Sequence, residues 1–101
     1  MTSKKRLGAI PNVPTIAESG VPGFDVSAWD ALFAPAGTPK PVVDRLSQAL
    51  AKVLRDEELR QQLAQRGSEP APASPEALRQ FIHLEIERWG AAIRRSGASL
   101  D

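Results

Sequence analysis

One strand-like segment constrains the fold of this chain more than any other feature. Residues 24–34 contain no glycine or proline, and their apolar residues first alternate from Phe24 and Val26 and then run together over 31–34. This pattern predicts a β-strand, and the continuous apolar run is typical of a strand buried on both faces of an α/β sheet. A single strand cannot form a sheet. We therefore expect either that the chain pairs with a second copy of itself or that its partner strands lie upstream of Met1 in a longer protein.

An irregular segment precedes this strand and three amphipathic helices follow it. Residues 1–23 are interrupted throughout by proline and glycine, which leaves room for one helical turn where Thr15 and Glu18 have the spacing of a capping box. After residue 39, apolar residues recur at steps of three and four, as on one face of a helix. The expected helices span about residues 39–55, 57–66 and 75–96. The predicted fold class is therefore an α/β fragment with one main strand and three helices.

The ends of these helices carry recognisable capping residues. Thr38, Asp56 and Ser74 stand where N-caps are expected, because a side-chain oxygen at that position can accept a free backbone N–H of the first turn. Gly67 and Gly97 stand where the second and third helices should stop, since glycine readily adopts the left-handed conformation of a C-terminal cap.

Composition excludes several classes of protein. The 101 residues are 42% hydrophobic and 25% charged, with a net charge of +1, so no general field attracts nucleic acid and no nucleic-acid partner is expected. The chain lacks cysteine, which excludes disulfides and thiolate metal sites. It has no run of about eighteen apolar residues to span a membrane. Basic residues at 4–6 are followed by no apolar stretch, so no signal peptide is expected in this chain.

Catalytic and metal-binding patterns are weak. His83 has Glu87 four residues on as its nearest possible co-ligand, and such a pair is far more often a surface ion pair than a metal site. Neither a nucleophile elbow nor a phosphate-binding glycine loop is present. Neighbouring carboxylates such as Glu85 and Glu87 are explained by solvated helix faces. We therefore expect no enzyme activity, no metal and no cofactor.

The best candidates for contact with a small molecule lie in the predicted strand. They are Phe24, Asp25, Ser27 and Trp29. Aromatic side chains often wall a ligand cleft, and the two polar residues can face a ligand. The competing interpretation is that the aromatic residues belong to a simple core and that the polar ones face solvent.

Ordered motifs along the chain resemble one known family. Pro-Asn-Val-Pro-Thr-Ile-Ala-Glu-Ser-Gly at 11–20 is followed by Pro-Gly-Phe at 22–24, by Trp29, and by Leu-Phe-Ala-Pro-Ala-Gly-Thr-Pro at 32–39. Later come Leu-Ser-Gln-Ala-Leu, Gly-Ser-Glu-Pro, Ser-Pro-Glu and Glu-Arg-Trp. Taken in order, these motifs are similar to the C-terminal region of the substrate-binding proteins of tripartite tricarboxylate transporters, also called Bug receptors, over nearly the whole chain.

The resemblance implies a fold, a function and a location. It implies that residues 24–101 are the C-terminal part of a two-lobed type II periplasmic-binding-protein fold, which closes on a small organic carboxylate and delivers it to a membrane permease. It also implies a periplasmic location. Family members commonly have an apolar or aromatic residue and then glycine after the tryptophan, whereas this chain has Asp30 and Ala31. An acid facing the cleft can repel a carboxylate, which leaves the ligand class open. The alternative is a free-standing module that forms a homodimer through its unpaired strand.

Overall fold

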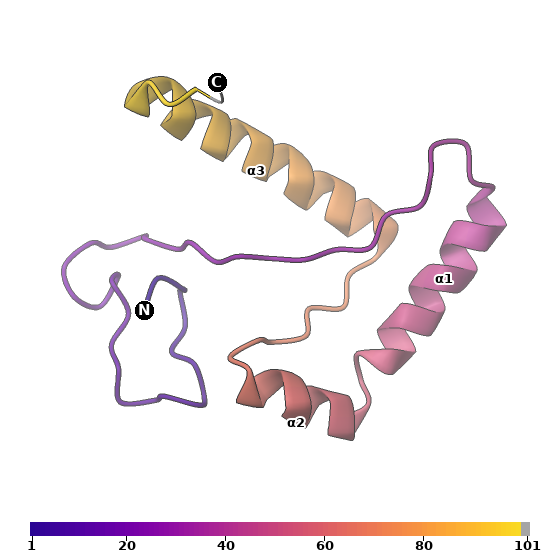
Figure 1. Ribbon diagram of the computed structural model, residues 1–101, viewed down its shortest axis with the longest axis horizontal. Helices are drawn as coiled ribbons and strands as arrows, with labels where there is room; N and C mark the ends of the chain where they lie inside the picture. The colour runs from indigo at the N-terminus through magenta and orange to yellow at the C-terminus, as the bar shows by residue number, and fades with distance from the viewer. Residues whose placement is uncertain (100–101) are drawn as a thin grey trace.

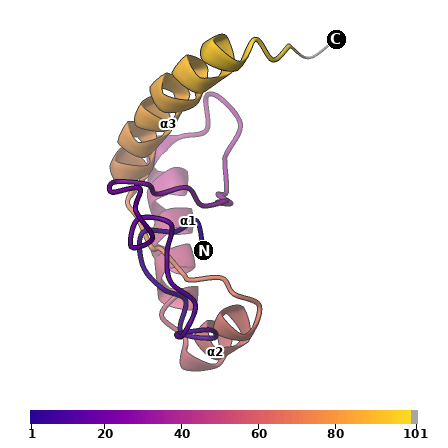
Figure 2. The ribbon, with the colours of Figure 1, turned by 90° about the vertical axis from the view of Figure 1, so that its left-hand side faces the viewer.

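The computed structural model describes residues 1–99 and contains three α-helices joined by extended segments (Figure 1). The helices are α1 (Lys40–Val53), α2 (Glu57–Gln65) and α3 (Pro75–Ser96). An N-terminal loop region leads into a long extended segment that runs past α3 before it turns into α1. Turned by 90°, these elements lie largely in one curved layer (Figure 2).

Two of the three predicted N-caps are present. The Asp56 carboxylate accepts the Leu59 N–H at 3.0 Å at the start of α2, and the Ser74 hydroxyl accepts the Ala77 N–H at 3.1 Å at the start of α3. The prediction for Thr38 was wrong. Its hydroxyl donates to the Pro35 carbonyl at 2.7 Å, inside the preceding turn, and α1 begins one residue later than that cap requires.

The two glycine stops have the conformation that their sequence position predicts. Gly97 caps α3 with φ of 68°, and Gly67 follows α2 with φ of 73°. Both angles lie in the left-handed region, where a side chain would be strained.

The predicted strand at residues 24–34 was wrong. In residues 1–99 no strand is present, and this segment is extended but without a hydrogen-bonded neighbour along its length. Its one backbone bond to a distant part of the chain joins the Val26 N–H to the Thr2 carbonyl at 2.9 Å. A strand is defined by pairing as well as by pattern, and within residues 1–99 this segment forms no ladder of backbone hydrogen bonds with another.

The N-terminal loop region folds back on itself. The Met1 amino group donates to the Pro14 carbonyl at 2.7 Å, and the Ile16 N–H donates to the Met1 carbonyl at 2.9 Å. The predicted turn after Thr15 is present, and Thr15 is the one buried residue among those described.

The described chain has no hydrophobic core of its own. None of its hydrophobic residues is buried, and the most exposed large ones, Leu32 and Phe33, are 75% and 69% exposed. Its radius of gyration is 16.7 Å, whereas a compact domain of this length has about 13 Å. The apolar faces that the sequence places on the helices are therefore left largely uncovered.

Candidate functional site

The extended segment is held against α3 through Trp29. Its indole ring packs edge-on against the Phe81 ring, with centroids 5.2 Å apart and planes at 75°, which is a favourable aromatic geometry. Its Nε1–H donates to the Glu85 carboxylate at 3.4 Å. Trp29 nevertheless stays 41% exposed, so one part of the indole is fixed while another remains exposed.

The four predicted ligand-binding residues lie in different surroundings. The carboxylate of Asp25 accepts the Lys4 backbone N–H at 2.9 Å, and its carbonyl oxygen accepts a hydrogen bond from the Arg88 guanidinium. Phe24 is half-buried at the end of a turn, where its N–H donates to the Val21 carbonyl at 3.2 Å. Ser27 is exposed. The structure therefore brings Asp25 and Trp29 together on one face of α3, while Asp25 already uses Oδ1 and its carbonyl oxygen within the chain.

Glu85 is the residue at this site that the sequence analysis missed. Its side chain is only 14% exposed, and one of its oxygens, Oε2, accepts the indole N–H groups of both Trp29 and Trp89, the latter at 2.9 Å. We expected a solvated helix face there. The signal was present in the spacing, since Phe81, Glu85 and Trp89 lie four residues apart and therefore share one face of the helix. A carboxylate that lies between two aromatic residues on an apolar helix face loses water, so it needs nearby hydrogen-bond donors, and this requirement pointed to Glu85.

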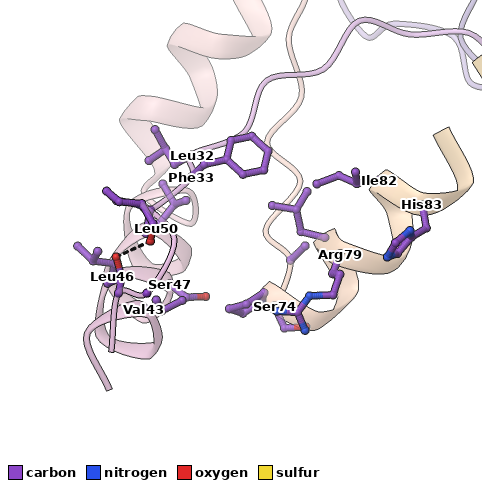
Figure 3. Close-up of a pocket in the computed structure, with 17 residues that line it drawn as sticks. Leu32, Phe33, Val43, Leu46, Ser47, Leu50, Ser74, Arg79, Ile82 and His83 are labelled. Carbon is purple, nitrogen blue, oxygen red and sulfur yellow. Dashed lines mark hydrogen bonds between the residues drawn. The ribbon is translucent and has the colours of Figure 1, made fainter. Parts of the chain in front are cut away.

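A second feature is an apolar groove of about 680 Å³ between α1, the start of α3 and the segment that precedes α1 (Figure 3). Leu46 and Leu50 line it from α1, and Leu78 and Ile82 line it from α3. His83 also lines the groove. Within residues 1–99, no three histidine, cysteine, aspartate or glutamate side chains cluster in a way that could hold a metal ion.

Comparison with known proteins decides the family. The model of the tripartite tricarboxylate transporter family receptor matches residues 1–98. The chain belongs to this receptor family. A UPF0065 protein of Agrobacterium vitis is 39% identical to it over 100 residues, covering 96% of this chain and 29% of that protein.

Solved structures of similar proteins share the arrangement of this receptor chain. The R. palustris protein Rpa4515, solved with adipate, superposes with a TM-score of 0.83 at 34% identity, over 95% of this chain and 32% of the other. The periplasmic binding protein BugD superposes with a TM-score of 0.81 at 39% identity, over 95% of this chain and 33% of the other. The chain thus spans about a third of the length of these proteins that it matches.

The family is described as a transporter receptor family, and its description names no enzyme activity. In the described part of the chain, no helix is both long and apolar enough to cross a membrane. The resemblance read from the ordered motifs is confirmed by the family match, whereas the strand inferred from the apolar pattern is not part of this structure.

Proposed function

We propose that this chain is the C-terminal part of a periplasmic receptor that binds a small organic carboxylate and presents it to a membrane permease. In the complete receptor it would form part of a two-lobed type II periplasmic-binding-protein fold. The observation that carries the proposal is the superposition of 95% of the chain on Rpa4515, solved with adipate, at 34% identity. The exposed part of the Trp29 indole supports it, because it offers an apolar wall to the methylene groups of such a ligand.

In this proposal, this chain contacts one part of the ligand and the rest of the receptor binds the ligand's carboxylate groups. Phe24, Asp25, Ser27 and Trp29 are the candidate contacts here, and Trp29 is the most favoured because it is anchored and still exposed. The ligand's carboxylate oxygens need backbone N–H donors and positive charge, as at helix N-termini. The Asp25 side chain supplies neither, and Asp30, next to Trp29, is exposed and acidic, so we assign the carboxylate-binding groups to the other two thirds of the receptor.

A receptor chimera tests this proposal. In the chimera, this chain replaces the matching third of Rpa4515, and adipate and other dicarboxylates are titrated by calorimetry. We expect the chimera to bind a dicarboxylate and Trp29→Ala to weaken that binding about tenfold, the effect of losing one well-placed aromatic contact. Trp29→Phe keeps the ring and is the matched control, with the smaller loss. A folded chimera that binds its dicarboxylate equally well with alanine at position 29 contradicts the role of Trp29, and one that binds none contradicts the proposed function.

A specific observation favours a second candidate function, that of a self-associating module. Large apolar side chains such as Leu84 and Ile86 on α3 are 65% and 64% exposed, and surfaces of this kind commonly mark protein interfaces. Light scattering of the chain over a range of concentrations distinguishes the two. A concentration-dependent dimer supports self-association, whereas a monomer at every concentration excludes it.

A further inference from the structure

The two tryptophans of this chain converge on one carboxylate. Trp29 comes from the extended segment and Trp89 from α3, and both indole N–H groups donate to Oε2 of Glu85, at 3.4 and 2.9 Å. Glu85 is largely shielded from water, with 14% of its side chain exposed. A shielded carboxylate needs donors to replace its hydration, so these bonds matter more to it than they would at the surface.

Arg88 completes the arrangement one turn further along α3. One of its guanidinium nitrogens, Nη1, lies 3.6 Å from Oε1 of Glu85, while Nη2 donates to the backbone carbonyl of Asp25. The guanidinium carbon also lies 5.9 Å from the centre of the Trp89 ring. The Glu85–Arg88 pair therefore holds the extended segment at two points four residues apart, the backbone at Asp25 and the side chain at Trp29.

We propose that Glu85 and Arg88 are positioning residues that clamp residues 25–29 onto α3 and so fix the orientation of the Trp29 indole. The segment has no sheet partner. The N-terminal loop holds only its start, through the bonds of Val26 to Thr2 and of Asp25 to Lys4, so side-chain contacts with α3 hold it at Trp29. Phe81 restrains one part of the indole, and Glu85 restrains its N–H. The part of this inference that concerns ligand affinity rests on the proposed receptor function, whereas the clamp itself does not.

The clamp can be tested in the chain itself by nuclear magnetic resonance. Its two tryptophans give two indole N–H signals, which Trp29→Phe assigns. We expect Glu85→Gln to shift both signals and to speed their exchange with deuterated water, because an amide oxygen is a weaker acceptor than a carboxylate. Arg88→Ala should shift the backbone signal of Val26, whose peptide bond contains the Asp25 carbonyl.

Glu87→Gln is the matched control, because it makes the same change of charge at an exposed position of the same helix. It should leave both indole signals in place. A Trp29 signal that stays unchanged in Glu85→Gln overturns the clamp, and so do indole signals that coincide at the unfolded position in the unmodified chain.

The effect on ligand binding is measured in the receptor chimera by a double-mutant cycle. We expect Glu85→Ala to weaken dicarboxylate binding about tenfold when Trp29 is present and to have little further effect in Trp29→Ala, because the two changes then act through the same indole. Restoration of most of the affinity by Glu85→Gln supports positioning, since glutamine can still accept one indole N–H. Losses that simply add overturn the positioning role. A chimera that binds no dicarboxylate contradicts the receptor function and leaves the resonance test to decide on the clamp.

Discussion

The Glu18 carboxylate links two parts of the N-terminal loop. Glu18 accepts the Thr15 N–H at 2.8 Å and pairs with the Arg6 guanidinium at 2.9 Å, while the Thr15 hydroxyl accepts the Glu18 N–H at 3.1 Å. The hydrogen bond from Arg6, followed by that from Thr15, lowers the pKa of Glu18 from 4.5 to about 2. One side chain thus closes the capping box and ties it to a residue twelve positions earlier.

This shift predicts how the loop responds to acid. Because the pKa of Glu18 is lower in the folded loop than in an unfolded chain, its contribution to stability is complete above about pH 4.5 and is lost as the pH falls towards 2. The Thr15 amide signal, followed by nuclear magnetic resonance against pH, should therefore have a midpoint close to 2. Arg6→Ala should move that midpoint upwards. A midpoint at the ordinary value of a glutamate in the unmodified chain contradicts the ion pair.

Sequence reasoning at this scale succeeds for neighbours and fails for distant partners. The spacing of Thr15 and Glu18 predicted the capping box, which is present. The pairing of Arg6 with Glu18, and of Trp29 with Glu85 across 56 positions, follows from how the loops fold, and no local pattern encodes it.

At the scale of elements, the positions of the helices follow from the residues at their ends and from the apolar residues that repeat along one face. The cap of α3 combines the Ser74 hydroxyl, a proline in the first turn and an acidic residue there, with Arg94 and Arg95 in its last turn. All of these features favour the helix macrodipole or satisfy free backbone groups. End signals of this kind located α2 and α3 from the sequence, whereas α1, whose predicted cap was wrong, was located by its apolar stripe.

Removal of the cap gives a local test. Ser74→Ala leaves the Ala77 N–H without its acceptor and should destabilise α3 by about 1 kcal/mol, the usual value for an N-cap. Far-UV circular dichroism during urea unfolding measures this change. Ser74→Asp is the control, because aspartate can accept the same N–H and should keep the stability. Equal losses in both variants contradict the cap.

The strand marks the limit of element-level reasoning. An apolar pattern reports which faces of a segment tend to be buried, while a strand also needs a neighbour whose backbone groups it can meet. Residues 24–34 have the pattern but no such neighbour within residues 1–99, so they are extended and contact α3 through side chains instead. Trp29 is 41% exposed rather than buried for the same reason, because α3 covers part of it and no neighbouring strand of the described chain covers the rest.

At the scale of the whole molecule, the main feature is an apolar surface without a cover. The helices and the groove between α1 and α3 expose side chains that an ordinary domain would enclose, and the radius of gyration of 16.7 Å reflects this openness. A chain that spans about a third of its relatives, and superposes closely on that third, has the form of one part of a larger body.

The isolated chain should therefore bind a hydrophobic dye such as anilinonaphthalene sulfonate, whose fluorescence rises on exposed apolar surface. In the receptor chimera the same surface should be covered, and dye fluorescence per mole should fall to the level of intact Rpa4515. A chimera that binds the dye as strongly as the isolated chain contradicts the view that these faces pack against the rest of a receptor.

The hydrogen bonds of Met1 are compatible with a longer polypeptide. The Met1 nitrogen donates to the Pro14 carbonyl, and the Met1 carbonyl accepts the Ile16 N–H. A peptide N–H at this position can also donate to that carbonyl of Pro14. A polypeptide joined to the Met1 nitrogen can thus keep both bonds. The loop would then hold the point where the two polypeptides are joined.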